Sequence, residues 1–253
     1  MPRVHKLAKS KYLKARTKKL FFLIHGYTGS PTDFNNLPRY LSEKFNANVY
    51  IPRIKGHGTN IQDLDFLEYS DILKQIEREL KKQVKKGMKI VIGGISLGGL
   101  IALHLACKYP VKAFFAVSIP YLYKFPFNVF NTINKVSWKK YWKKPFPDFE
   151  KKLRLGSFSY DSVHIKVFKM IKQAKKELKK IKEKHVPCFI IYAKKDAFVD
   201  EKSAKILKCK LKDSCEVLVL GPKKKCTHNL FYSPLNNMIN RKIASFITKN
   251  KIL

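Results

Sequence analysis

Six short apolar runs alternate with segments of helical spacing along this chain of 253 residues. The runs are residues 20–24, 48–51, 89–92, 113–119, 187–193 and 215–220. Short runs that are apolar throughout are typical of strands that are buried on both faces of a sheet. Strands that alternate with helices form a mainly parallel sheet with helices on both faces. The sequence therefore predicts an α/β fold, and the chain is long enough for the large core that such a fold needs.

The fourth and fifth runs are separated by residues 121–185, far more than the roughly 2 to 6 residues of an ordinary connection. We therefore expect an inserted cap, and a core made of residues 20–120 and 186–253. The first half of this insert holds ten aromatic side chains, which either line an acyl pocket or form the small core of the cap itself. They are Tyr121, Tyr123, Phe125, Phe127, Phe130, Trp138, Tyr141, Trp142, Phe146 and Phe149. Residues 165–184 have the spacing of a lysine-rich helix.

The net charge of +35 sets the chain apart from most globular proteins. Only seven of its 53 basic residues are arginine, whereas sequence-specific binding of nucleic acid relies on the planar guanidinium group, so we expect no nucleic-acid partner. A solvated surface of compositional origin is the favoured interpretation, and weak contact with an anionic membrane surface is the alternative. Residues 1–19 are expected to form a frayed basic N-terminal arm. A transmembrane helix needs about 18 consecutive apolar residues, and no apolar run in this sequence approaches that length.

The cysteines are odd in number and form no Cys-x-x-Cys pair. They are Cys107, Cys188, Cys209, Cys215 and Cys226. This spacing predicts neither a zinc site nor a redox motif, and we expect no metal and no cofactor. Reduced thiols are typical of a cytoplasmic protein, which is the location we expect.

The chemistry centres on Gly94-Ile95-Ser96-Leu97-Gly98, which lies between an apolar run and a helical segment. A serine on a sharp turn from strand to helix exposes its hydroxyl at the end of the sheet, as in a nucleophile elbow. Side chains at positions 94 and 98 would collide as the helix folds back against the strand. We therefore predict that Ser96 is a nucleophile, and a mere packing turn is the alternative.

A serine hydroxyl needs a base and an acid that orients the base, and in this motif their order along the chain is serine, acid, histidine. His228 follows the sixth run, so it emerges at the sheet edge where Ser96 lies, whereas His185 precedes a run and belongs to the opposite edge. The fifth run is followed by Asp196 and Asp200. Asp200 is also suited to cap the next helix, so Asp196 is the favoured acid.

The oxyanion of the tetrahedral intermediate needs backbone N–H donors. Leu97 follows the nucleophile and supplies one of them, and the second is expected from loop 25–27, where Gly26 lets the backbone approach a substrate. His25 and His57 precede both the nucleophile and the acid, so we expect them to brace loops.

Together these segments resemble the α/β-hydrolase superfamily, and within it the small bacterial carboxylesterase and monoacylglycerol lipase group. The resemblance covers residues 20 to 250 and rests on His25-Gly26-Tyr27-Thr28-Gly29-Ser30, Gly56-His57-Gly58, Gly94-Ile95-Ser96-Leu97-Gly98-Gly99 and the loops of Asp196 and His228. It implies Ser96 as nucleophile, Asp196 and His228 as its partners, and the amides of Tyr27 and Leu97 as the oxyanion hole. Cys226-Thr227-His228 departs from the family, which usually has glycine before this histidine.

We therefore expect a serine hydrolase without a cofactor that cleaves carboxylic esters of apolar acyl groups through an acyl-enzyme. The same elbow serves thioesterases and amidases, so the bond that is cleaved stays open. A hypothesis from a different class is a basic protein that binds an anionic membrane or nucleic acid peripherally and keeps only a vestigial site.

Overall fold

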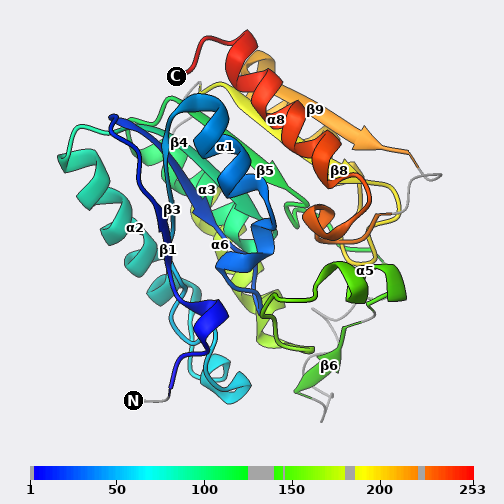
Figure 1. The fold of residues 1–253 in the computed structure, drawn as a ribbon. Coiled ribbons are helices and arrows are strands. Elements are labelled where there is room, and N and C mark those ends of the chain that lie inside the picture. Colours follow the sequence, from blue (N-terminus) through cyan, green and yellow to red (C-terminus); the bar gives the residue numbers. More distant parts are fainter. Residues whose placement is uncertain (1–2, 125–139, 145, 180–185, 222–225) are drawn as a thin grey trace.

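The computed structural model describes residues 3–124, 140–144, 146–179, 186–221 and 226–253 (Figure 1). A seven-stranded sheet in the order β1-β3-β2-β4-β5-β8-β9 forms its centre. The strands are β1 (Lys11–Leu13), β2 (Lys19–Ile24), β3 (Asn48–Ile51), β4 (Lys89–Ile95), β5 (Ala113–Val117), β8 (Cys188–Ala193) and β9 (Cys215–Leu220). Every neighbouring pair is parallel except β1 with β3. The predicted mainly parallel sheet is confirmed, and all six apolar runs are strands of it.

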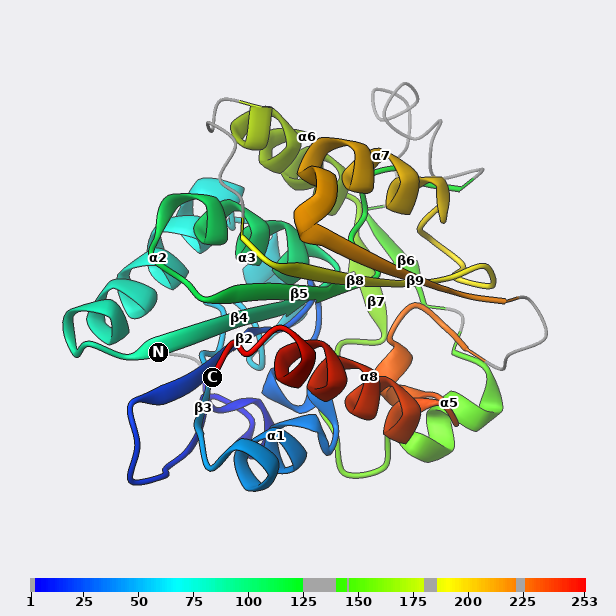
Figure 2. The ribbon, with the colours of Figure 1, turned by 90° about the horizontal axis from the view of Figure 1, so that it is seen from above.

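Helices cover both faces of the sheet (Figure 2). They are α1 (Leu37–Phe45), α2 (Tyr69–Lys85), α3 (Leu97–Lys108), α5 (Asp148–Leu153), α6 (Lys166–Lys179), α7 (Lys202–Leu211) and α8 (Asn236–Lys249), with 3-10 turns at Lys6–Ala8, Pro31–Phe34, Ile61–Leu64, Lys212–Ser214 and Leu230–Tyr232. Helices α2, α3, α6 and α7 lie on one face, and α1 and α8 lie on the other (Figure 2). Among the described residues, no helix is both long and apolar enough to cross a membrane.

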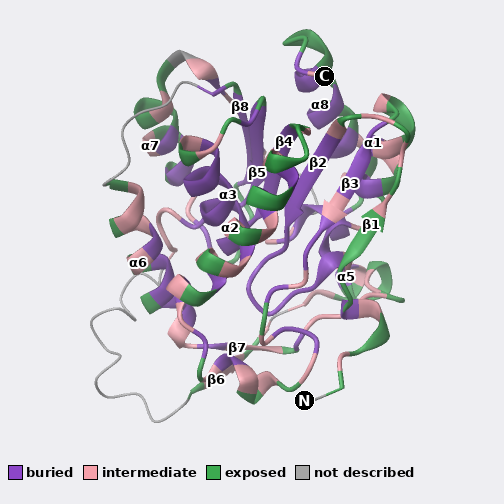
Figure 3. Ribbon diagram, turned by 90° about the vertical axis from the view of Figure 1, so that its left-hand side faces the viewer, coloured by how far each residue is buried: buried purple, intermediate pink, exposed green. Residues whose placement is uncertain are grey.

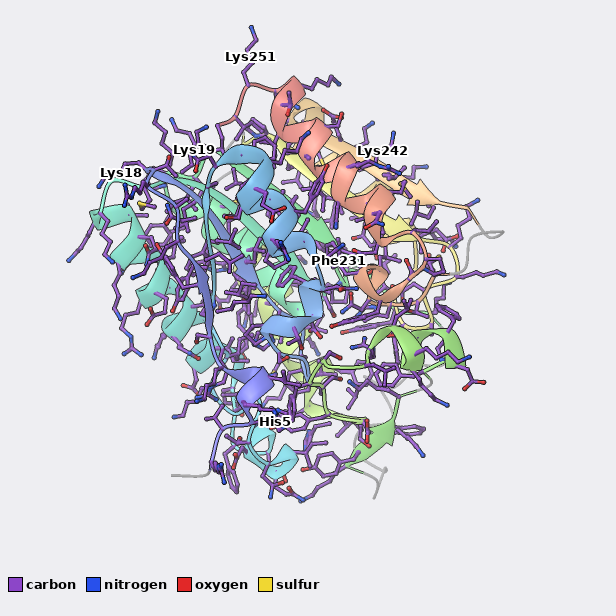
Figure 4. All side chains as sticks on the ribbon, viewed as in Figure 1. His5, Lys18, Lys19, Phe231, Lys242 and Lys251 are labelled. Carbon is purple, nitrogen blue, oxygen red and sulfur yellow. The ribbon has the colours of Figure 1, made fainter. Side chains whose placement is uncertain are left out.

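Strand β2 shows why the runs are apolar at every position. Phe22 and Ile24 pack into the core below α2 and α3, whereas Phe21 and Leu23 pack into the core below α1 and α8. Successive side chains of a strand point to opposite faces, and here both faces are covered by helices. Strands β4, β5 and β8 are accordingly buried in the middle of the molecule, whereas the edge strand β1 is largely exposed (Figure 3). Lysines gather outside, and Lys242 and Lys251 project away from α8 and the chain end (Figure 4).

The N-terminal segment differs from the expected frayed arm. Strand β1 pairs antiparallel with β3 and extends the sheet at its edge. Tyr12 of β1 packs against Tyr50 of β3, with the ring centroids 5.5 Å apart. Ala8 is fully buried against Gly58, where an added Cβ would lie 2.2 Å from the Ala8 Cβ. A three-residue strand that contains lysine is too short to show a period, so its pairing depends on a partner far along the chain.

The segment Ser30-Pro31-Thr32-Asp33 has the N-cap, proline and acid of a helix start, which predicts one helix that continues through Leu41, and this prediction is wrong. A 3-10 turn over Pro31–Phe34 ends at Asn35, whose φ of +48° interrupts the helix before α1 starts. Ser30 does cap this turn, since its Oγ accepts the N–H of Thr32. Asparagine adopts positive φ more readily than most residues, which allows the break. The turn directs Asp33 into the interior, where it is buried.

The described part of the insert contains β6 (Tyr141–Lys143) and β7 (Ser162–His164), which form an antiparallel pair, together with α5 and α6. The predicted helix over residues 165–184 is found as α6, which covers Lys166–Lys179. Residues 180–184 of that prediction, Phe125, Phe127, Phe130, Trp138 and His185 lie outside the described residues.

Candidate active site

Ser96 lies on the turn between β4 and α3, with a φ of +53° and a ψ of −123°. Its N–H donates to the carbonyl oxygen of Val117 at 2.9 Å, which ties the turn to the neighbouring strand. A Cβ on Gly94 would lie 2.3 Å from the oxygen of Gly98, and a Cβ on Gly98 would lie 2.2 Å from the oxygen of Ile24. Both distances are far below van der Waals contact. The predicted steric reason for the two glycines is therefore confirmed.

The structure brings His228 and Asp196 into direct contact. The Nδ1 atom of His228 lies 2.9 Å from Oδ2 and 3.1 Å from Oδ1 of Asp196. Oδ1 also accepts the N–H groups of Phe198 and Val199, at 2.8 and 3.0 Å, so the carboxylate is held from two sides. The Asp196 side chain is fully buried, whereas that of His228 is 25% exposed. With Nδ1 donating to the carboxylate, Nε2 of His228 is left to accept a proton.

The pair shifts both pKa values. Burial lowers the pKa of His228, but the negative charge of Asp196 and its hydrogen bond outweigh burial and raise that pKa above its ordinary value. Burial raises the pKa of Asp196, but His228 and the two N–H donors lower it below its ordinary value overall. Asp196 is therefore ionised wherever His228 titrates, and the imidazole is a stronger base than a free one.

Asp200, the competing carboxylate, has a different partner. Its Oδ1 accepts the N–H of Lys202, the first residue of α7, at 2.9 Å. This is the capping contact that the sequence predicts for Asp200.

His25 and His57 brace loops, as predicted. The N–H of Ile54 donates to Nε2 of His25 at 3.1 Å, and Nδ1 of His25 lies 2.9 Å from the oxygen of Gly26. In the same way, the N–H of Thr28 donates to Nε2 of His57 at 3.1 Å. Burial lowers the pKa of His25 well below its ordinary value and that of His57 to about 4. Both rings are therefore neutral at neutral pH and hold the loop after β2 to the loop after β3.

Tyr27 and Leu97, the two expected oxyanion donors, belong to the loop after β2 and to the start of α3. Leu97 is the first residue of α3, so its N–H has no acceptor one turn earlier within the helix. Its side chain is fully buried in the core. The loop of Tyr27 is tight: Thr28 has a φ of +67°, and the N–H of Gly29 donates to the oxygen of Gly26 at 3.2 Å.

Ser96, His228 and Tyr27 share the wall of one cavity of about 690 Å³, which lies between the ends of the central strands and the insert. Four of the ten aromatic residues named from the sequence line this cavity, namely Tyr123, Trp142, Phe146 and Phe149, and Phe168 of α6 lines it as well. Two others pack within the insert or against the core instead. Tyr121 lies under the ammonium group of Lys175, and Tyr141 packs against His164. Some of these aromatic residues therefore line the cavity, and others pack against neighbouring side chains.

The backbone before His228 also bears on the family pattern. Thr227 is not one of the described residues that have a positive φ. Threonine is therefore accommodated here without the left-handed conformation that would favour glycine.

Sequence reasoning missed one polar part of the cavity wall, which consists of Asp33, Lys144, Glu150 and Arg154. These residues come from the loop after β2 and from the insert, and only the fold brings them together. Arg154 carried a signal, because it is one of only seven arginines in a lysine-rich chain. In the part of the chain that the structure describes, no three His, Cys, Asp or Glu side chains are placed to hold a metal ion.

Comparison with known proteins bears on the family and the fold of the chain. The model of the alpha/beta hydrolase family matches residues 21–208. A thermostable monoacylglycerol lipase of Bacillus sp. (strain H-257) is 32% identical over 88 residues, a match that covers 35% of this chain and 35% of the lipase. A carboxylesterase of Bacillus subtilis (strain 168) is 22% identical over 75% of this chain and 76% of its own.

Solved structures extend the likeness over nearly the whole fold. One comes from work on LipS and LipT, two metagenome-derived lipolytic enzymes; it superposes with a TM-score of 0.80 at 18% identity and covers 98% of this chain and 100% of that chain. This likeness concerns the fold alone. The chain belongs to the alpha/beta hydrolase family, because the family model matches most of its length. The parallel sheet and the strained turn at Ser96 are consistent with this family.

Proposed function

We propose that the protein is a serine esterase that cleaves carboxylic esters with apolar acyl groups. One observation carries the proposal: the hydrogen-bonded Asp196–His228 pair opens onto the same cavity as Ser96 on its strained turn. In this proposal residues 20–120 and 186–253 form the catalytic core, and residues 121–185 form a cap over the cavity. The odd number of cysteines, with no Cys-x-x-Cys pair, suits a reducing compartment such as the cytoplasm.

The proposed reaction follows from these positions. Oγ of Ser96 attacks the ester carbonyl carbon while Nε2 of His228 takes its proton, and Asp196 stabilises the imidazolium that forms. The N–H groups of Tyr27 and Leu97 stabilise the oxyanion. His228 then returns the proton to the alcohol oxygen as the C–O bond breaks. Water attacks the acyl-enzyme in the same manner and releases the carboxylic acid.

In this proposal the acyl group binds against an apolar wall of the same cavity. Val167, Phe168 and Ile171 of α6 line it and are buried among apolar neighbours. Burial of an acyl chain there gains about 0.8 kcal/mol per CH₂ group. The two curated relatives, a monoacylglycerol lipase and a carboxylesterase, also favour an ester over the thioester or amide that the same residues can attack.

A panel of p-nitrophenyl esters from acetate to dodecanoate tests the proposal, with thioester and anilide analogues beside it. Ser96→Ala is expected to lose about 10⁶ in kcat, as removal of the nucleophile does in serine hydrolases generally. Ser118→Ala is the matched control. Ser118 also has a φ of +53°, it is fully buried, and its Oγ has no hydrogen-bond partner in the described part of the chain. Turnover by Ser96→Ala at the wild-type rate would refute the proposal.

A further inference from the structure

The cavity has two chemically different walls, which come from opposite sides of the sheet. The wall on the side of α6 is apolar, whereas the wall on the side of α5 carries Lys144, Glu150 and Arg154. Figure 2 places α6 beside α7 on one side of the sheet and α5 near α8 on the other. An ester that spans Ser96 can therefore place its acyl chain against α6 and its alcohol part against α5.

The α5 wall lies close to His228, which supports this orientation. Glu150 and Lys144 both influence the pKa of His228, the former raising it and the latter lowering it. His228 must lie beside the alcohol oxygen in order to protonate it as it leaves. The alcohol part of a bound ester is therefore the part that meets Lys144, Glu150 and Arg154.

Arg154 is already neutralised by its neighbours. Its guanidinium nitrogens lie 2.6 and 2.7 Å from Oε1 of Glu150, and a third approaches Asp33 at 3.9 Å. The guanidinium also lies between two rings, 4.6 Å from the centroid of Phe146 and 4.4 Å from that of Tyr232. Arg154 thus has carboxylate and aromatic partners before any substrate binds.

Lys144 has an aromatic partner, since its Nζ lies 4.9 Å from the centroid of the Phe146 ring, but its hydrogen-bond partners are neutral. Its Nζ donates to the hydroxyl oxygens of Thr28, at 3.1 Å, and of Ser159, at 2.6 Å, both of which are neutral. The pKa of Lys144 is raised at longer range by three carboxylates, those of Asp33, Asp161 and Glu150. Among the described residues, none of these carboxylates is in ion-pair contact with Nζ of Lys144. Burial, with the nearby charge of Arg154, lowers the pKa of Lys144 to about 7. A partly buried cation without a counter-ion carries a desolvation cost, and an anion beside it offsets that cost.

The net charge of the whole cavity wall also favours an anionic ligand. Its described residues include four cationic side chains and only two carboxylates. The cations are Lys143, Lys144, Arg154 and Lys195, and the carboxylates are Asp33 and Glu150, both of which are engaged by Arg154. Lys143 and Lys195 are exposed and Arg154 is paired with carboxylates, so the half-buried Lys144 is the cation of this wall left for a ligand.

We propose that this site takes esters whose alcohol part carries an anionic group, a carboxylate or a phosphate, and that Lys144 binds that group. The inference rests on the proposed esterase function and names its substrate class. The ammonium group of Lys144 forms a charge-assisted hydrogen bond with an anionic oxygen, while Thr28 and Ser159 hold Nζ at the edge of the oxyanion loop.

Three butanoate esters with related phenolic leaving groups test the inference. The 4-carboxyphenyl and 4-phosphonooxyphenyl esters are anionic, and the 4-carbamoylphenyl ester is their neutral counterpart. We measure kcat/KM for each in 1 M NaCl, where a Debye length of about 3 Å removes steering by the distant surface charge. The wild type is expected to favour at least one anionic ester by about tenfold or more. The anion with the larger ratio identifies carboxylate or phosphate as the group.

Lys144→Gln keeps a hydrogen-bonding side chain without the charge, and it is expected to bring the ratio of anionic to neutral ester close to one. Lys140→Gln removes the same charge from an exposed position outside the cavity wall and is expected to leave the ratio unchanged. A wild-type ratio near one, or a ratio that Lys144→Gln preserves, overturns the inference. If Lys144→Gln does not fold, the inference is judged by the wild-type ratio of kcat/KM for the anionic and neutral esters in 1 M NaCl. Failure of the wild type to cleave any of the three esters refutes the proposed function itself, which separates the two outcomes.

Discussion

Replacement of Asp196 by asparagine preserves the shape of this side chain and reverses one of its hydrogen bonds. Oδ1 accepts the N–H groups of Phe198 and Val199, so the amide oxygen of an asparagine must occupy that position. The amide nitrogen then occupies the place of Oδ2, which lies 2.9 Å from Nδ1 of His228. An NH₂ group there donates to Nδ1 and drives the imidazole proton to Nε2. In that tautomer His228 cannot accept the proton of Ser96.

This change of tautomer costs about 10⁴ in kcat in serine proteases, and we expect a loss of that order for Asp196→Asn. The pH profile should change as well. The wild type needs neutral His228, whose pKa is raised, so kcat/KM should rise with pH through a midpoint above about 6.5. Asparagine removes the charge that raises this pKa and leaves burial, which lowers it. The midpoint of the residual activity should therefore move to lower pH.

The assay is kcat/KM for p-nitrophenyl butanoate between pH 5 and 9, with Asp200→Asn as the control. Asparagine caps a helix as well as aspartate does, so Asp200→Asn should keep both the activity and the stability of the wild type. An Asp196→Asn enzyme with more than a tenth of the wild-type kcat and an unchanged midpoint would refute this reasoning. A 10⁴-fold loss in Asp200→Asn instead would assign the acid to Asp200.

Three further changes test the geometry around the site. Gly98→Ala places a Cβ 2.2 Å from the oxygen of Ile24 and should cost about 1 to 3 kcal/mol of unfolding free energy or more, measured by thermal melting. Gly221→Ala, whose added Cβ meets no atom of the described residues within 4 Å, should melt as the wild type does. Trp142→Ala should lower kcat/KM for dodecanoate more than for acetate, because Trp142 lines the cavity, and equal losses would mean that it only holds the cap together. His57→Phe leaves the N–H of Thr28 without its acceptor and should cost about 1 to 3 kcal/mol while lowering kcat, so a wild-type kcat would contradict the bracing role.

The parts that sequence predicts well have a local cause or follow from the parallel topology of the sheet. A run that is apolar at every position marks a strand with helices on both faces, and β2 packs accordingly. The contact between Gly94 and Gly98 depends on residues four apart, so the turn around Ser96 shows in the sequence. The meeting of Asp196 with His228 follows from parallel topology, because the residues after β8 and β9 emerge at one edge.

The parts that sequence does not predict depend on distant partners. Lys144 resembles every other lysine of the chain until the insert places it against Thr28 and Ser159. Asp33 has the spacing of a residue in the first turn of a helix, but Asn35 ends that turn early and Asp33 becomes a buried neighbour of Arg154. Burial of these side chains is a property of the assembled fold, which no local pattern encodes.

The most direct test of the central claim is to map the residue that a fluorophosphonate modifies. The wild-type protein is incubated with the reagent, digested, and analysed by mass spectrometry for the modified peptide. The account predicts a single adduct on Ser96 and the loss of that adduct in both Ser96→Ala and His228→Ala, since His228 activates the hydroxyl. Absence of an adduct in the wild type, or an adduct on Ser159 of the same cavity wall instead of Ser96, would contradict it.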